Sequence, residues 1–194
     1  IICGVSVESR EIRTEEEATF DFSQVIGRTF TLTTATQIPV TTAKTPHTFE
    51  ALVHLPKMAV GRGGVILGNY TGGTEDQINL EIHNTGRVRL FYVKDGVKYD
   101  QIFNTDVRSD SVIHIAVTVD GTTATLYVGG APVEVATWAV PLPENMTTYT
   151  VGGDSRQGNA QYFRGTIYVV HLFADVRTAS EMRSDAVQIA DTAG

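Results

Sequence analysis

The amino-acid sequence predicts an all-β domain, a sandwich or barrel of short strands, followed by one short C-terminal helix. Runs in which apolar and polar residues alternate recur from residue 18 to residue 173, and this is the period of a half-buried strand. Turn residues rich in Gly, Asn and Asp separate these runs. The chain has 194 residues, of which 42% are hydrophobic, so it is long enough to bury the core of one such domain.

The predicted strands follow one another with short turns between them. In chain order they span residues 18–22, 28–34, 47–55, 63–69, 76–83, 87–94, 97–103, 112–119, 122–129, 132–137, 147–152 and 161–173. Residues 1–17 are rich in charge and are expected to form an exposed lead-in. We therefore expect a single domain over residues 18–194.

The clearest hairpin lies over residues 113–128. The buried face of its first strand is predicted from alternate apolar residues, namely Ile113, Ile115, Val117 and Val119. The residues between them, His114 among them, are expected to face solvent. Asp120-Gly121 supplies the turn, after which the same period of two resumes.

A second hairpin is predicted around the loop 84–86, which ends in a Gly that can adopt the left-handed conformation. This loop sets Leu80 opposite Leu90 on one face and Glu81 opposite Arg89 on the other. Opposite charges across a strand pair contribute about 0.2–1 kcal/mol, so the Glu81–Arg89 pair is expected to help fix the register.

The one predicted helix spans residues 178–190. Thr178 and Ser180 are its N-cap candidates, and Glu181 lies in the first turn. Its apolar face, which would dock it on the strands, is formed by Met182, Ala186 and Ile189.

The composition argues against two classes of partner. The net charge of −7 argues against nucleic acid, because the chain could not neutralise a run of phosphates. No apolar run has the length of a membrane span, so membrane insertion is not expected. Cys3 is the single cysteine, so no disulfide can form within the chain and the fold must depend on its core.

Four segments resemble, in order and spacing, the motifs of laminin-G-like domains of the concanavalin A type. They are the strand at 48–53, the hairpins at 78–93 and 114–130, and the closing segment 151–182 with its Phe163-Arg164-Gly165-Thr166-Ile167 element. The resemblance implies a two-sheet antiparallel jelly-roll sandwich. It also implies a carbohydrate-binding or adhesive module of a secreted or cell-surface protein, tethered to other domains of its parent chain.

The chain departs from the family pattern in places. Tyr168 stands where many relatives carry an acidic residue, and Gly129 stands where they carry Asn. Since the acidic residue contributes to a calcium site in many relatives, no metal ligand is carried over to Tyr168.

Catalysis on such a fold requires two carboxylates on alternate residues of one strand, about 5–5.5 Å apart in retaining glycosidases. Glu81 has no such partner in its strand, and Glu75-Asp76 lie at a strand entry. The five histidines show no metal-ligand spacing, and no Gly-x-Ser-x-Gly element is present. The domain itself is therefore not expected to be an enzyme.

Sugar binding requires an aromatic surface and a few planar polar groups on an accessible face. The strands expected to form the concave sheet supply the ligand-binding candidates Tyr70, Glu81, Arg87, Arg89, Tyr92 and Tyr99. An arginine that forks onto a carboxylate would suit an acidic sugar. The alternative interpretation of Glu81 and Arg89 is a cross-strand salt bridge on a solvated sheet.

A calcium ion is the one cofactor considered. The oxygen-rich loops 69–76 and 152–159, together with a carboxylate from the N-terminal part, could supply the six to eight oxygens that calcium requires. The candidate ligands are Asp21, Asp154 and Asn159. The alternative is that these residues only form turns.

The leading functional hypothesis is a non-catalytic carbohydrate-binding module appended to a glycan-degrading enzyme, with a glycan as its partner. The alternative is a protein-interaction or adhesion domain on the same sandwich. A glycan-cleaving enzyme is the third hypothesis.

Overall fold

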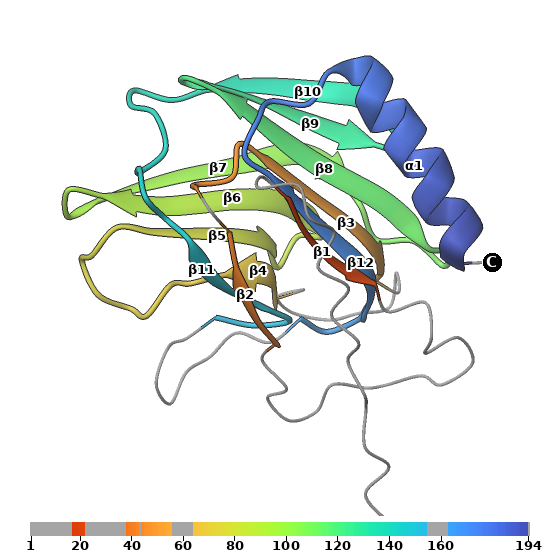
Figure 1. The fold of residues 1–194 in the computed structure, drawn as a ribbon, viewed down its shortest axis with the longest axis horizontal. Helices are drawn as coiled ribbons and strands as arrows, with labels where there is room; N and C mark the ends of the chain where they lie inside the picture. Colours follow the sequence, from red (N-terminus) through yellow and green to blue (C-terminus); the bar gives the residue numbers. More distant parts are fainter. Residues whose placement is uncertain (1–16, 22–37, 43, 56–63, 155–162, 194) are drawn as a thin grey trace, which may run out of the picture.

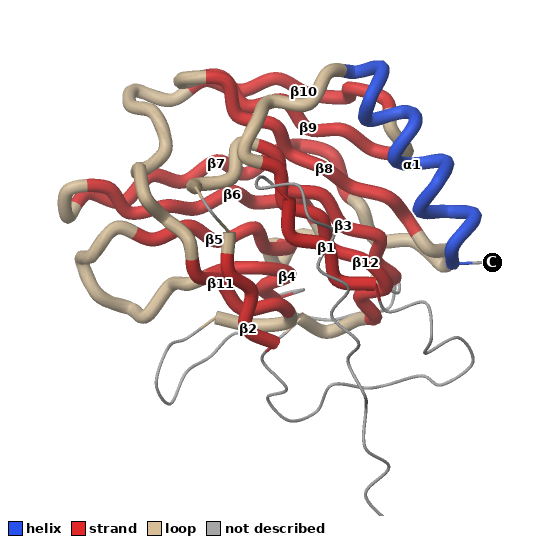
Figure 2. The backbone as a smooth tube through the Cα atoms, in the orientation of Figure 1, coloured by secondary structure: helices blue, strands red, loops and turns tan. Residues whose placement is uncertain are grey.

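The computed structural model describes residues 17–21, 38–42, 44–55, 64–154 and 163–193, which form two antiparallel sheets and one helix (Figures 1 and 2). Sheet A contains six strands in the spatial order β1 (Glu17–Asp21), β12 (Thr166–Phe173), β3 (Thr48–His54), β8 (Ile113–Asp120), β9 (Thr123–Val128) and β10 (Ala131–Thr137). Sheet B contains six in the order β2 (Ile38–Thr41), β11 (Thr148–Val151), β4 (Gly64–Gly68), β5 (Gln77–Ile82), β6 (Arg87–Lys94) and β7 (Val97–Asp106). The helix α1 (Ala179–Ala193) follows β12. The predicted two-sheet jelly-roll sandwich with a C-terminal helix is confirmed.

The core lies between the two sheets, because alternate residues of each strand point inward. Sheet A supplies buried apolar side chains from β3, β8, β9 and β12, among them Phe49, Val117, Leu126 and Val170. Sheet B supplies others from β4, β5, β6 and β11, among them Ile66, Leu80, Leu90 and Tyr149. The residues between these core positions therefore point to the outer face of each sheet.

The registers of both predicted hairpins are confirmed. In β8–β9, Val117 pairs with Leu126 across the Asp120-Gly121 turn. In β5–β6, Leu80 pairs with Leu90 and Glu81 with Arg89.

Some strand boundaries differ from the prediction. Strand β2 was not predicted; it contains Pro39, which lacks an amide donor and is tolerated here because β2 is the edge of sheet B. Strand β7 extends to Asp106, and β12 begins at Thr166. The predicted strand 28–34 and the lead-in 1–16 lie outside the described residues, as does Cys3.

On β8 the outer face of sheet A is not solvated, contrary to the expectation for His114 and its neighbours. His114, Ala116 and Thr118 are all buried. Helix α1 lies against this face over β8, β9 and β10, with Met182 packed on Ala116 and Tyr127 (Figure 1).

Helix α1 begins with a reciprocal capping box, in which Thr178, one of the two predicted N-cap candidates, is the N-cap. The Glu181 amide donates to Thr178 Oγ1 at 3.3 Å, and the Thr178 amide donates to Glu181 Oε2 at 2.7 Å. Of its predicted apolar face, Met182 and Ala186 are buried, and the Ile189 side chain lies outside the described residues.

The two sheets are also joined at one pair of edges, β7 and β10. Glu134 on β10 accepts hydrogen bonds from the Asn104 backbone amide at 2.6 Å and from its Nδ2 at 3.0 Å. In the described part of the chain, no helix is both long and apolar enough to span a membrane.

Candidate functional site

The predicted ligand-binding residues concentrate on the outer face of sheet B, which points away from the core. Period-two alternation places on this face Gln77, Asn79 and Glu81 from β5, Arg87, Arg89, Phe91 and Val93 from β6, and Lys98 and Asp100 from β7. Its half nearest β5 is buried, and its accessible groups lie along β6 and β7.

Arg89 forms a clamp across three strands of this face. Its Nε and Nη2 donate to the two carboxylate oxygens of Asp100 on β7, each at 2.6 Å, and its Nη1 donates to Glu81 on β5 at 2.5 Å. Burial lowers the pKa of Arg89, but the hydrogen bonds and charges of Asp100 and Glu81 outweigh it and raise the pKa overall. Because its fork is occupied, Arg89 fixes the geometry of the face and cannot also fork onto a ligand carboxylate.

Arg87 lies two residues away on the same face and is half-buried. Its guanidinium makes no hydrogen bond or ion pair with any residue that the structure describes. The pKa of Asp106 is lowered mainly by its hydrogen bond from Arg108. The positive charge of Arg87 also lowers this pKa, as the weakest of the causes. Of the two predicted arginines, Arg87 is the one whose donors remain open to a ligand.

An aromatic pair borders the clamp. Tyr70 meets Phe91 edge to face, with ring centroids 4.9 Å apart, and Arg89 Cζ lies 5.1 Å from the Phe91 centroid. Lys98 Nζ donates to the Tyr70 hydroxyl at 3.0 Å. Both rings are largely buried, so they offer an edge rather than a broad stacking surface. The sequence prediction missed Phe91 and Lys98, although alternation with Arg87 and Arg89 was sufficient to find Phe91.

Tyr92 and Tyr99 are corrections to the predicted ligand set, because they do not lie on this face. Tyr92 is fully buried in the core, where its hydroxyl donates to the Val140 carbonyl at 2.6 Å. Tyr99 is half-buried and stacks on Tyr92, with centroids 4.9 Å apart and planes 18° apart. Burial, and then the neighbouring Tyr99, raise the pKa of Tyr92 to about 12. The physical reason is parity: Tyr92 shares its face of β6 with the core residues Val88 and Leu90.

The calcium candidates are described only in part. Asp154 follows β11 and is fully buried, and its Oδ2 accepts from Asn79 Nδ2 at 3.5 Å. Asp21 ends β1 in sheet A, and its side chain lies outside the described residues together with Asn159. Among the described residues, no three His, Cys, Asp or Glu side chains are gathered as a metal site requires.

Side-chain oxygens near loop 69–76 act within the protein. Asn69 Oδ1 accepts from the Ile78 amide at 2.7 Å, and Gln77 Oε1 accepts from the Thr71 amide at 2.8 Å. This pattern is that of polar residues that stabilise a turn. The calcium site remains a prediction.

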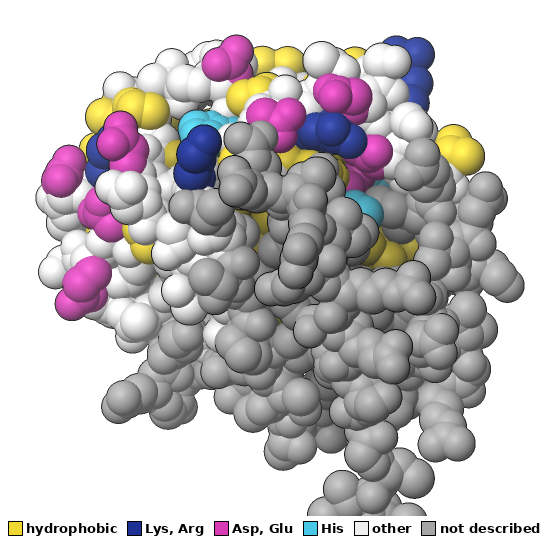
Figure 3. All heavy atoms as spheres, viewed as in Figure 1, with side chains coloured by type: hydrophobic (Ala, Val, Ile, Leu, Met, Phe, Trp, Pro, Cys, Tyr) yellow, Lys and Arg dark blue, Asp and Glu magenta, His cyan; other side chains and the backbone are white. Residues whose placement is uncertain are grey.

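The charged side chains described on the face in Figure 3 are mixed rather than segregated. On the face in Figure 3, acidic and basic side chains of the described residues lie close together, and they form no extended basic patch there. On the outer face of sheet B, Glu81 and Asp100 both pair with Arg89, an arrangement that suits a rigid clamp rather than proton transfer.

The fold is a two-sheet antiparallel β-sandwich of the jelly-roll class. A family model described as the concanavalin A-like lectin/glucanases superfamily, Laminin_G_3, matches residues 26–183, and the chain belongs to this family. A search of curated proteins finds no match.

Solved structures of the same fold include parts of glycan-degrading enzymes. The CBM40 domain of the Ruminococcus gnavus IT-sialidase, bound to α2,3-sialyllactose, is 21% identical with a TM-score of 0.58, covering 73% of this chain and 83% of that one. Domain 4 of AbnA, an extracellular GH43 arabinanase from Geobacillus stearothermophilus in complex with arabinotriose, is 15% identical with a TM-score of 0.56, covering 74% and 67%. The leech intramolecular trans-sialidase is 18% identical with a TM-score of 0.58, and the match covers 92% of this chain but 27% of that protein.

Proposed function

We propose that the chain is a non-catalytic carbohydrate-binding module that acts outside the cell and is attached, in its parent protein, to a glycan-degrading enzyme. Its family and the sugars bound to two structures of the same fold support this proposal. The observation that carries it is the outer face of sheet B, where Arg89 is clamped between Glu81 and Asp100, and Arg87, two residues away on the same face, presents an open guanidinium.

Binding on this face follows from the groups that remain accessible. Arg87 donates to sugar hydroxyl or carboxylate oxygens. The Asp100 side chain is 44% exposed, so each of its oxygens can accept from a sugar hydroxyl beside its bond to Arg89. Tyr70 and Phe91 present ring edges to the C–H groups of a sugar. The clamp keeps these groups in place before the ligand arrives, which lowers the entropic cost of binding.

A glycan array probed with the whole chain tests the proposal, followed by titration of the best glycan with two variants. Arg87→Ala removes the open donor and is expected to weaken binding about tenfold or more, as for a hydrogen bond to a charged group. Arg183→Ala, an exposed arginine on α1, is the matched control and should leave affinity unchanged.

A folded chain that binds no glycan on the array would contradict the proposal. If it instead captured a protein partner that survives enzymatic deglycosylation, the adhesion hypothesis would replace it.

A further inference from the structure

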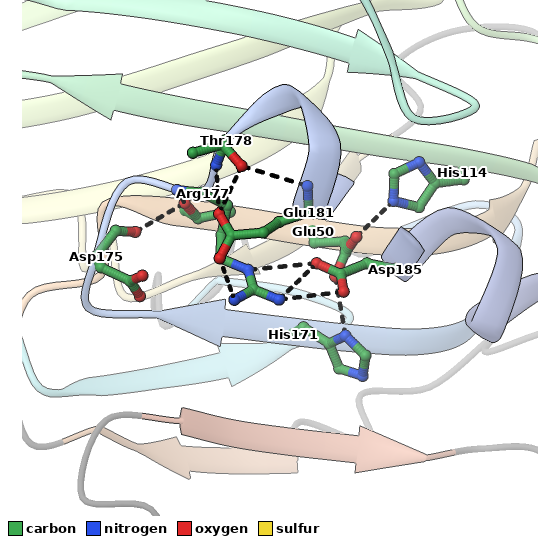
Figure 4. Close-up of polar contacts among 9 residues, drawn as sticks. Glu50, His114, His171, Asp175, Arg177, Thr178, Glu181 and Asp185 are labelled. Carbon is green, nitrogen blue, oxygen red and sulfur yellow. Dashed lines mark hydrogen bonds and ion pairs between the residues drawn. The ribbon is translucent and has the colours of Figure 1, made fainter. Parts of the chain in front are cut away.

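A second polar cluster, on the outer face of sheet A, is unrelated to the glycan-binding proposal. Its centre is Glu50 on β3, which is fully buried (Figure 4). Its Oε1 lies 2.6 Å from His114 Nε2 on β8, and its Oε2 lies 2.8 Å from His171 Nδ1 on β12. Burial raises the pKa of Glu50, but the hydrogen bonds and charges of the two histidines outweigh it, so that the pKa is lowered overall. The carboxylate is therefore ionised, and both ring nitrogens donate to it.

The two histidines differ in their capacity to take up a proton. His114 Nδ1 accepts a hydrogen bond from the Gly130 amide at 3.2 Å, so His114 is neutral with its hydrogen on Nε2. A proton on Nδ1 would face the Gly130 N–H and convert an attraction into a donor–donor repulsion. His171 uses only Nδ1, its Nε2 has no partner among the described residues, and its side chain is 18% exposed. It can add a proton and keep its bond to Glu50.

Gly130 belongs to the turn against which α1 packs. Gly129 and Gly130 form the two-residue connection from β9 to β10, with φ of 58° and 74°, the left-handed values that a type I′ turn requires. A Cβ on Gly130 would lie 2.8 Å from Arg183 Cα and 2.9 Å from the Met182 carbonyl oxygen. The helix backbone is therefore packed directly on the turn. His114 bonds to the same turn twice, because its ring accepts from the Gly130 amide and its carbonyl accepts from the Gly129 amide at 2.9 Å.

We propose that His114 makes the attachment of α1 pH-sensitive: a proton on its Nδ1 breaks the hydrogen bond to Gly130 and loosens the turn and the helix together. The two ring nitrogens of His114 bond in different directions. Nε2 bonds to Glu50 in the sheet, and Nδ1 bonds to Gly130 in the turn beneath the helix. Acidification supplies the proton.

Charged and titratable groups lie on every element packed against His114. Glu50 on β3, His171 on β12 and, from α1 and the segment before it, Arg177, Glu181 and Asp185 are drawn in Figure 4. Tyr127 on β9 and Arg183 on α1 complete the set. Arg177 pairs with Glu181 at 3.2 Å and with Asp185 at 2.9 Å, so it partly compensates the charge of these two carboxylates. A proton can join the open Nε2 of His171 without breaking a hydrogen bond, whereas a proton on His114 Nδ1 costs the hydrogen bond from Gly130.

The test is amide hydrogen exchange of the whole chain at about pH 7.5 and about pH 5, corrected for the intrinsic pH dependence of exchange. Peptides over 127–137 and 179–193 are expected to lose about tenfold in protection at the lower pH, the factor that one hydrogen bond is worth. Peptides from β5 and β6 serve as the internal reference and should keep their protection.

Two substitutions at one position separate the roles of the ring nitrogens. His114→Asn places an amide oxygen where Nδ1 lies, so it keeps an acceptor for Gly130 and does not titrate; the pH response of α1 should disappear. His114→Gln reaches toward Glu50 and leaves Gly130 without its acceptor; α1 should be loose at both pH values. His171→Asn keeps a donor to Glu50 and should retain the response.

The proposal fails if protection over 127–137 and 179–193 is the same at both pH values, or if His114→Asn retains the response. Should a variant not fold, ¹⁵N NMR of the unmodified chain decides the question. The His114 ring nitrogens and the Gly130 amide must then titrate with one common midpoint, and separate midpoints would overturn the proposal.

Discussion

Arg89 connects three strands of sheet B through a single guanidinium, since it donates to Glu81 on β5 and to Asp100 on β7. Its side chain is 17% exposed, that of Glu81 5% and that of Asp100 44%. The Glu81 half of the clamp is therefore the half shielded from solvent, and its loss should dominate the energetic effect of removing Arg89.

Arg89→Ala is expected to lower the free energy of unfolding by about 2 kcal/mol, because it leaves the Glu81 carboxylate buried without its partner. Urea denaturation followed by circular dichroism measures this. Arg108→Ala removes an arginine that is 29% exposed and paired with the 46% exposed Asp106, and it should nearly match the unmodified chain. Equal stability of both variants would show that the clamp contributes nothing.

Tyr92→Phe removes the hydroxyl that donates to the Val140 carbonyl inside the protein. We expect a loss of about 1 kcal/mol in unfolding free energy and an unchanged affinity for glycan, since the ring faces the core. Denaturation and glycan titration of the same preparation provide both readings. A variant with normal stability and lost binding would return Tyr92 to the ligand set.

Glu50 predicts a defined dependence of stability on pH. Its folded-state pKa lies below the ordinary value of 4.5, so its contribution is complete above that value and is lost as the pH falls through the folded-state pKa. Glu50→Gln should therefore be less stable than the unmodified chain at about pH 7, by about 2–4 kcal/mol, with the gap narrowing at about pH 3. Chemical denaturation at both pH values checks this, and a gap that widens in acid would contradict it.

At the scale of single elements, α1 depends on its cap as well as on its packing. Thr178→Ala removes the acceptor for the Glu181 amide and should cost about 1 kcal/mol. Thr178→Ser keeps the hydroxyl and should restore most of the loss. Unfolding curves and hydrogen exchange of residues 179–193 measure both variants, and an alanine variant as stable as the serine one would assign no energetic role to the cap.

Comparison of the predicted and observed strands shows which contacts a local sequence pattern can predict. The hairpin registers, the capping box and the Glu81–Arg89 pair were all predictable, because period-two alternation and turn chemistry act within about ten residues. Tyr92 was misplaced although its parity with Leu90 marks it as a core residue. The partners of Glu50 were not predictable, because His114 and His171 are 64 and 121 positions away and only the strand order of sheet A brings them together.

At the scale of the whole molecule, the calcium site of the sequence analysis has a direct test. A site that includes Asp154 predicts a higher melting temperature in calcium than in a chelator, and Asp154→Asn should abolish the difference. Identical melting of the unmodified chain in both solutions would remove calcium from consideration.

The contact between Glu134 and Asn104 at the β7 and β10 edges has a consequence for how the molecule behaves in a crowded solution. The outermost strand of a sheet presents unpaired amides that a strand from another molecule can use as a template. By occupying the Asn104 amide with a carboxylate, the chain removes one of these docking points and places a negative charge beside it. Where many copies of the chain lie close together, this contact works against their joining edge to edge.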